Sequence, residues 1–144
     1  MSRSLERRAR KVALWILYSV DLTGAPVDEA LELCHDSMDD IIKSDPDLWN
    51  KVVESVNGVT NCFDELNVAI QAVSPRWKLD RMAAIDRTIL RIGAWEVMHA
   101  NALPLPVINH CVDLGKEYGE KSTSGFVNGL LDELCKTQGI ALNK

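Results

Sequence analysis

The fold is decided by residues 49–73, whose sequence is WNKVVESVNGVTNCFDELNVAIQAV. Apolar side chains recur there at alternating intervals of three and four residues: Trp49, Val52, Val56, Val59, Phe63, Leu66, Ile70 and Val73. This spacing is typical of a helix with a narrow apolar seam that packs between two other helices. The alternation at every second residue that marks a half-buried strand is absent. We therefore expect one helix here, the longest of the chain, with Phe63 buried in its seam.

The segments on either side also show helical periodicity. The first helix is predicted to stop at Gly24 and Pro26, and Asp45 and Pro46 are predicted to begin the central helix. The prolines of residues 103–106 predict a stiff extended link. The expected helices cover about residues 4–22, 27–43, 46–73, 77–82, 84–100, 107–118 and 126–135. The sequence therefore predicts an all-α protein of about seven helices.

The composition is that of an ordinary globular protein. The chain has 144 residues, of which 47% are hydrophobic and 26% are charged, so it can bury a core without a disulfide or a metal. No apolar run reaches the roughly 18–20 residues that span a bilayer, and the start does not read as a signal peptide. The four cysteines form no CxxC pair. We expect them to be buried as small hydrophobic side chains, and we expect the protein to lie in a reducing cytoplasm. We expect no metal and no cofactor.

The net charge of −5 is distributed unevenly along the chain. Residues 1–21 carry five basic groups against two acidic ones, whereas residues 22–75 carry two against eleven. Residues 76–101 are basic again, with five against three. Because the balance changes sign after Ser74-Pro75, we expect one domain, residues 1–144, made of subdomains 1–74 and 75–144.

The first helix combines a core-facing stripe with a basic and aromatic opposite face. The stripe consists of Leu5, Ala9, Val12, Ala13, Ile16, Leu17 and Val20. At 100° per residue, Arg7, Lys11 and Tyr18 lie one above another, with Leu14 among them. The flanking positions are Arg10 on one side and Arg8 with Trp15 on the other. Arginine and lysine neutralise phosphates, and Tyr or Trp can stack on unpaired bases. This pattern indicates RNA binding; the alternative is that another helix covers Leu14 and Trp15 and the cations only solubilise the protein.

A second basic cluster follows the central helix and consists of Arg76, Lys78, Arg81, Arg87 and Arg91. It could extend the basic surface and bind a partner. It could equally pair within the molecule, with Asp80, Asp86 or Glu96 as carboxylate partners. Both interpretations remain open on the sequence.

Catalytic motifs are absent. Residues 115–122 contain two glycines, a lysine and a serine, but their spacing does not match a phosphate-binding loop and no strand precedes them. Neither G-x-S-x-G nor H-E-x-x-H occurs. The sequence therefore predicts a binding protein and not an enzyme.

Three blocks of the chain together resemble the NusB family of bacterial transcription antitermination factors. They are RRARKVALWILY with DLTG (residues 7–18 and 21–24), IDRTILRIGAWE (85–96), and PVIN, LGKEYG and FVNGLLD (106–109, 114–119 and 126–132). The resemblance covers essentially the whole length, and the order and spacing of the blocks make it specific.

This resemblance implies two packed three-helix-bundle subdomains, a cytoplasmic location, and binding to boxA RNA of ribosomal RNA leader transcripts. The implied partners are the ribosomal protein NusE and an elongation complex with other Nus factors. The resemblance implies RNA contacts at the first helix and between the last two helices. Lys11 is added because its helical phase places it on the same face. The candidates are Arg7, Arg8, Arg10, Lys11, Tyr18, Tyr118, Ser122 and Phe126. NusE is expected on the C-terminal bundle, where the basic cluster offers Arg76, Arg81 and Arg87.

The chain departs from the family pattern at four places: Lys11, Trp15, His110 and Ser122. The first two make the first helix more basic and more aromatic, and we interpret His110 as a surface change. Two other functions remain open. One is a helical interaction module without RNA affinity; the other is the NusB-like domain that begins some ribosomal RNA cytosine methyltransferases. The latter needs a Rossmann-type domain, and no βαβ pattern occurs here.

Overall fold

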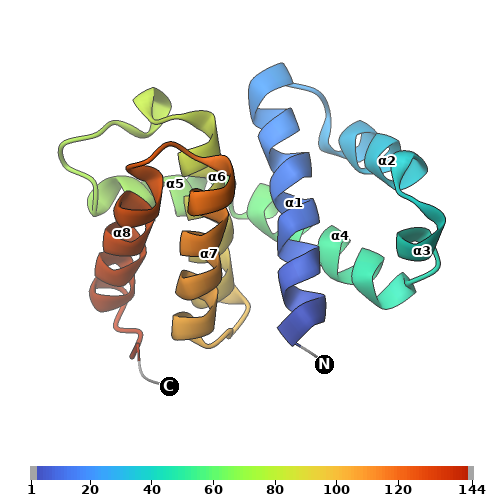
Figure 1. Cartoon of the computed structure of the whole chain (residues 1–144). Coiled ribbons are helices and arrows are strands. Elements are labelled where there is room, and N and C mark those ends of the chain that lie inside the picture. Colours follow the sequence, from blue (N-terminus) through green and yellow to red (C-terminus); the bar gives the residue numbers. More distant parts are fainter. Residues whose placement is uncertain (1–2, 143–144) are drawn as a thin grey trace. The chain divides into compact units, whose positions relative to one another are not determined.

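The computed structural model describes residues 3–142, apart from the side chains of residues 3, 41 and 42. Helices dominate this range and no strand occurs in it (Figure 1), which confirms the predicted all-α class. The chain forms two compact units that meet in the sequence between Asn61 and Cys62. The boundary expected from charge lies later, at 74/75, because the charge balance changes there, whereas the packing changes where the central helix breaks.

The N-terminal unit is built on α1 (Arg3–Thr23), the longest helix of the described residues. It packs against α4 (Pro46–Asn61) and α2 (Val27–Ser37), while the short α3 (Asp40–Lys43) packs against α4. The buried apolar residues of α1 and α4 include Ala9, Ala13, Ile16, Leu17, Leu48, Val52, Val56 and Val59. Most of these belong to the two stripes that the sequence predicted to face the core.

Two of the predicted helix boundaries are confirmed in atomic detail. Gly24 has a φ of +71°, and its N–H donates to the Val20 carbonyl at 2.8 Å, as in a glycine C-cap. At the next helix start, the Leu48 N–H donates to Asp45 Oδ1 at 3.1 Å, and Pro46 is the first residue of α4. Both signals are local, so the sequence alone was sufficient to find them.

The second helix, expected over residues 27–43, is instead two helices. Met38 has an extended backbone, with φ −68° and ψ 148°, and separates α2 from α3. No residue of α2 is buried, so tertiary packing does little to hold a longer helix together. The Asp39 carbonyl accepts the Lys43 N–H at 2.9 Å; this places Asp39 at a helix start, a position that aspartate favours over helix interiors.

The central helix is also broken, which corrects the expectation of one long helix. Cys62, with φ −105° and ψ 15°, separates α4 from α5 (Phe63–Ala72). Just before the break, Thr60 Oγ1 donates to the Val56 carbonyl at 2.8 Å, a contact that weakens and bends helices. Just after it, Asp64 and Glu65 occupy the first turn of α5, where acidic groups stabilise a new N-terminus.

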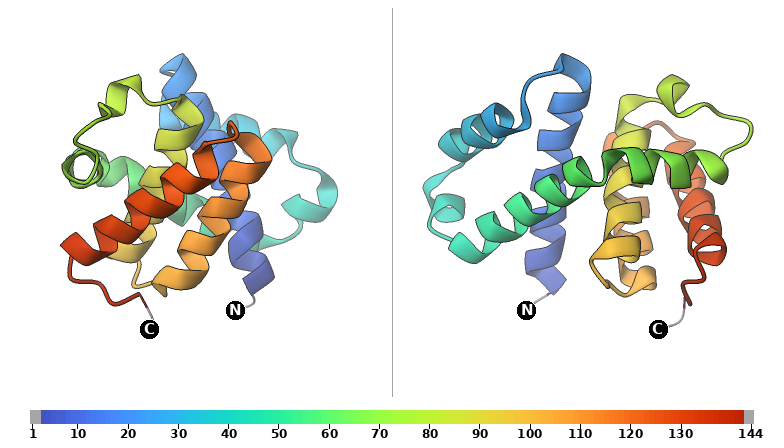
Figure 2. Two further views of the ribbon diagram at one scale, coloured as in Figure 1. Left: turned by 60° about the vertical axis from the view of Figure 1, so that its left-hand side comes forward. Right: turned by 180° about the vertical axis from the view of Figure 1, so that it is seen from behind.

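The C-terminal unit surrounds α6 (Ala84–His99). This helix packs against α5, α7 (Pro104–Tyr118) and α8 (Thr123–Thr137), and Figure 2 shows α6, α7 and α8 side by side. Every residue from Thr88 to Trp95 is buried. A Cβ on Gly93 would lie only 2.8 Å from Leu131 Cδ1 and 3.2 Å from Cys111 Sγ, so a larger residue would force these buried side chains to move.

Three expectations for this unit differ from the structure. Leu103-Pro-Leu-Pro106 is not an extended link, because α7 begins at Pro104; prolines fit the first turn of a helix, where the N–H groups have no intrahelical partner. His110 is not a surface residue, since only 7% of it is exposed. The expected short helix at 77–82 is reduced to the 3-10 turn η1 (Leu79–Arg81).

All four cysteines are free thiols. Cys111 and Cys135 are buried, as expected, whereas Cys34 and Cys62 are half-buried. Burial raises the pKa of the Cys34 and Cys135 thiols, with Asp132 adding to the effect at Cys135. Among the described residues, no helix combines the length and hydrophobicity required to cross a membrane.

Candidate nucleic-acid interface

The exposed side of α1 carries Arg8, Lys11 and Trp15. At 100° per residue these three positions lie within an arc of about 60°. Arg7 and Tyr18 are half-buried along one edge of the arc. We call these five residues the α1 face. It places three cations and two aromatic rings on one surface of a single rigid helix, which suits the phosphates and unpaired bases of an RNA strand.

Two residues expected on or beside this face are buried instead. Arg10 is 5% exposed and Leu14 is 1% exposed. The buried side of α1 is therefore wider than the single stripe that the sequence suggested. The exposed side is consequently displaced toward the flank that carries Arg8 and Trp15. Arg10 is therefore the least accessible of the candidate RNA-binding cations in α1.

Trp15 is the residue of this face that the sequence reasoning undervalued. Its side chain is among the large apolar groups that remain exposed, with 58% of its surface accessible. It lies four residues after Lys11 and seven after Arg8, so all three share one side of the helix. That spacing was visible in the sequence, but the position of the core stripe was needed to show that Trp15 is outside the core.

Arg8 links the α1 face to the start of α4. Its Nη1 lies 3.7 Å from Asp45 Oδ2, and both side chains are partly exposed. The other carboxylate oxygen of Asp45 caps α4 through the Leu48 N–H. An exposed pair at this distance contributes little to stability. Any anion that bound the Arg8 guanidinium would therefore have to displace the Asp45 carboxylate.

The remaining RNA candidates lie where α7 connects to α8. Tyr118 ends α7 and is half-buried, Ser122 precedes α8 and is exposed, and Phe126 in the first turn of α8 is half-buried. The connection is fixed by Thr123, which is 1% exposed. Its hydroxyl donates to Asp86 Oδ1 at 2.8 Å and accepts the Glu120 N–H at 3.0 Å. The structure thus brings these three candidates together within the C-terminal unit.

Thr123→Val is expected to destabilise the protein by about 1–3 kcal/mol, because it removes a buried hydroxyl and leaves the Asp86 carboxylate and the Glu120 N–H without this partner. Thermal unfolding followed by circular dichroism measures the effect. Thr137→Val makes the same change at an exposed position near the end of α8 and should melt like the parent. Equal melting temperatures for both variants would show that Thr123 does not fix the connection.

Two arginines of the second basic cluster, Arg87 and Arg91, form hydrogen bonds within the protein. Arg87 Nη1 donates to the carbonyls of Asp80, at 3.3 Å, and Met82, at 2.9 Å. Arg91 is 7% exposed, donates from Nε to Asn67 Oδ1 at 2.9 Å and lies 4.5 Å from the centre of the Phe63 ring.

Arg76, Lys78 and Arg81 are exposed. Internal bonding thus holds for Arg87 and Arg91, and carbonyl and amide oxygens are among their acceptors. Of the three candidate NusE contacts, Arg76 and Arg81 are the more accessible.

A known protein family matches most of the chain. The model of the NusB family matches residues 7–136. The chain belongs to the NusB family. The match includes the whole α1 face and the connection between α7 and α8, so no part of the candidate interface lies outside the NusB homology.

Individual NusB proteins are similar over nearly their full length. The chain is 40% identical to the transcription antitermination protein NusB of Myxococcus xanthus over 139 residues, which make up 96% of each chain. It is 36% identical to the corresponding protein of Bacillus subtilis, covering 89% of this chain and 92% of that one.

Solved NusB structures share the fold. A crystal structure of antitermination factors NusB and NusE in complex with dsRNA superposes with a TM-score of 0.83 at 25% identity, covering 95% of this chain and 99% of that one. A Thermotoga maritima NusB structure superposes with a TM-score of 0.82 at 22% identity, covering 94% and 92%. The latter shows likeness of fold alone.

Proposed function

We propose that this chain is a transcription antitermination factor that binds boxA-type RNA of ribosomal RNA leader transcripts together with ribosomal protein NusE. It would do so in the cytoplasm, as part of an elongation complex that contains other Nus factors. The proposed role is binding and not catalysis. The observation that carries the proposal is the α1 face, where exposed cations and an exposed indole share one side of a helix.

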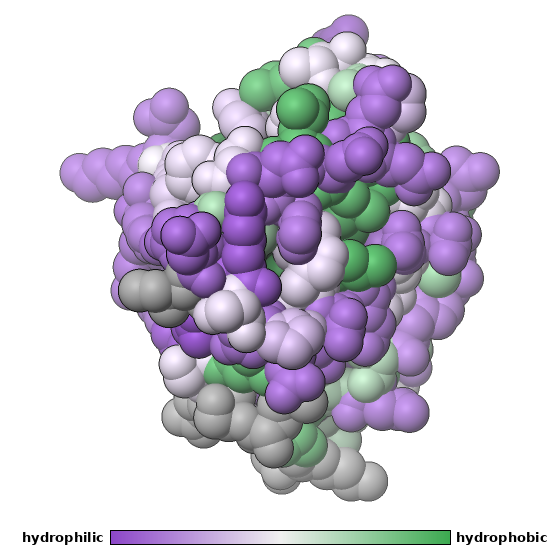
Figure 3. Space-filling view, turned by 90° about the vertical axis from the view of Figure 1, so that its right-hand side faces the viewer, coloured by the Kyte–Doolittle hydropathy of each residue, from purple (hydrophilic) through white to green (hydrophobic). Residues whose placement is uncertain are grey.

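The charge distribution restricts where RNA can bind. The protein is acidic overall, and residues 22–75 carry eleven acidic groups against two basic ones. Hydrophilic residues cover much of the face drawn in Figure 3, and α2 and α3 belong to the acidic segment. Since phosphates are repelled by carboxylates, an RNA strand should approach along the α1 face and not over α2 and α3.

Aromatic side chains add a contribution that is independent of charge. Trp15 is exposed beside Lys11, and Tyr18 is half-buried at the edge of the same face. Stacking of one base on an aromatic ring is worth about 1–3 kcal/mol and changes little with salt. We propose that Trp15 or Tyr18 stacks a base while Arg7, Arg8 and Lys11 contact phosphates.

Two further surfaces complete the proposal. Tyr118, Ser122 and Phe126 would form RNA contacts of their own at the start of α8. NusE would dock on the C-terminal unit, where Arg76 and Arg81 are exposed. The family membership of the chain supports this arrangement, as does its similarity to a NusB protein crystallised with NusE and dsRNA.

Titration of boxA RNA into the protein, with and without NusE and at two salt concentrations, tests this function. A shuffled RNA of the same composition is the control. We expect boxA to bind more tightly than the shuffled RNA, NusE to increase the affinity, and higher salt to weaken it. NusE binding without any salt-dependent RNA binding would instead indicate a helical interaction module.

A further inference from the structure

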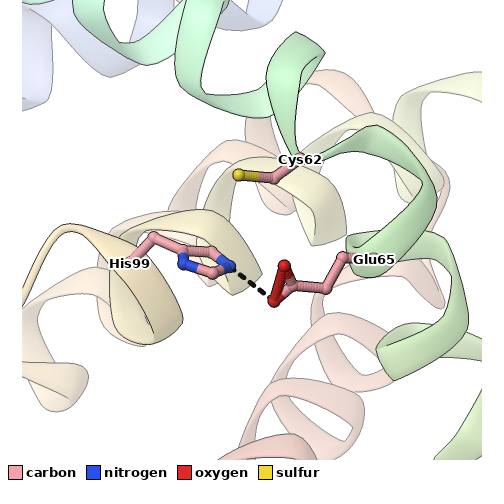
Figure 4. A group of neighbouring side chains, drawn as sticks. All are labelled: Cys62, Glu65 and His99. Atoms are coloured by element: carbon pink, nitrogen blue, oxygen red, sulfur yellow. Dashed lines mark ion pairs between the residues drawn. The ribbon is translucent and has the colours of Figure 1, made fainter.

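Three metal-ligating side chains converge where α5 begins and α6 ends. The ligand atoms of Cys62, Glu65 and His99 all lie within 4.8 Å of one another. Figure 4 shows the Cys62 thiol and the Glu65 carboxylate turned toward the His99 ring. His99 Nε2 is 2.8 Å from Glu65 Oε2. All three residues belong to the C-terminal unit, so its own packing of α5 against α6 creates the cluster.

The donor set favours one class of cation. A thiolate, an imidazole and a carboxylate are the ligands of Zn²⁺ and similar divalent transition metals, whereas Mg²⁺ and Ca²⁺ prefer oxygen alone. We propose that Cys62, Glu65 and His99 bind a Zn²⁺-type cation, with the fourth position open to water. Three protein ligands and one open position form a common tetrahedral arrangement for this ion.

The site needs only small adjustments to close around the metal. Bond lengths of about 2.0–2.3 Å place the donors of a tetrahedral site roughly 3.5 Å apart. Separations near the upper limit of 4.8 Å must therefore shorten by about 1 Å, whereas the 2.8 Å between His99 Nε2 and Glu65 Oε2 must lengthen by about 0.5 Å. Glu65 and His99 are exposed and Cys62 is half-buried, so side-chain rotation can supply this movement. The ion would then connect the first turn of α5 to the last turn of α6.

Metal binding would release protons from the ligands. The Cys62 thiol loses its proton to solvent when sulfur binds the metal. The hydrogen that His99 Nε2 shares with Glu65 is released or moves to Nδ1, and the Glu65 oxygen binds the metal instead. No oxidant or reductant is involved. The sequence expected no metal because Cys62 and His99 are far apart in the chain, and only the packing of α5 against α6 brings them together.

Titration of Co²⁺ into the full-length reduced protein tests the site, since Co²⁺ reports its ligands through absorption. We expect one Co²⁺ per chain, a near-ultraviolet thiolate-to-cobalt charge-transfer band, and displacement of Co²⁺ by Zn²⁺. Cys62→Ser should abolish the band. His99→Ala and Glu65→Gln should weaken Co²⁺ binding at least tenfold, since even supporting partners of metal ligands contribute about 10–100-fold.

Matched controls are available at the other half-buried thiol and the neighbouring imidazole. Cys34→Ser and His35→Ala replace residues outside the cluster and should leave the band and the affinity unchanged. Zn²⁺ should also raise the melting temperature of the parent but not that of Cys62→Ser. The proposal is overturned if the parent shows no charge-transfer band, or if Cys62→Ser retains it.

Discussion

Val56→Asp is expected to unfold the N-terminal unit. Val56 is fully buried, with 0% of its surface exposed, and it lies on α4, which packs against α1. The substitution would place a carboxylate in an apolar core without a partner, and such burial costs several kcal/mol. This is comparable with the whole stability of a small domain, about 5–15 kcal/mol. Circular dichroism should show loss of helix or a sharply lowered melting temperature.

Phe63→Asp is the matched control, because the structure corrects its expected place in the core. Phe63 is 41% exposed, and its ring contacts the Arg91 guanidinium. The substitution removes a cation–π contact worth about 0.5–2 kcal/mol, but aspartate at the first position of α5 favours the helix N-terminus. Cooperative melting near the parent temperature is expected. If Val56→Asp also melted near the parent temperature, the core of this unit would be misassigned.

Alanine substitutions on the α1 face are expected to distinguish the contribution of charge to RNA affinity from that of base stacking. Arg8→Ala and Lys11→Ala should each weaken RNA binding and reduce the steepness of its salt dependence by about 0.7 in a log–log plot. Trp15→Ala should lower the RNA affinity by about 1–3 kcal/mol with almost the same steepness. Thermal melts alongside the titrations should show that all three variants remain folded, because these side chains are exposed.

Asp45→Asn tests the same face in the opposite direction. It removes the charge that lies 3.7 Å from Arg8, and asparagine still caps α4. RNA affinity should therefore rise while the melting temperature stays near that of the parent. Weaker binding in this variant would show that Asp45 positions Arg8 for RNA and does not compete for it.

Local sequence signals predicted the ends of helices well. Gly24 and Asp45-Pro46 act within one helical turn, so their residue types were sufficient. The break at Cys62 was missed because the apolar spacing continues through it, whereas the backbone responds to Thr60 and to the acidic first turn of α5. The Leu103–Pro106 segment was misread because proline is compatible both with an extended link and with a helix start.

The candidate site was predicted only in part, because helical phase is a local signal and burial depends on packing. Helical phase identified Arg7, Arg8, Lys11 and Tyr18 as members of one basic and aromatic surface. It could not fix how far the buried side of α1 extends around the helix, and Arg10 was therefore expected at the surface, whereas it is buried. The Cys62, Glu65 and His99 cluster could not be predicted, because it depends on the packing of α5 against α6.

The salt dependence of boxA RNA binding by the double variant Arg8→Ala/Lys11→Ala tests the central claim most directly. The matched control is Lys51→Ala/Lys136→Ala, which removes the same charge from α4 and α8. We predict that the steepness of the log–log plot falls by about 1.4 in the α1 double variant, from two lost phosphate contacts, and stays at the parent value in the control. Parent affinity and parent steepness in the α1 double variant would contradict the assignment of RNA binding to this face.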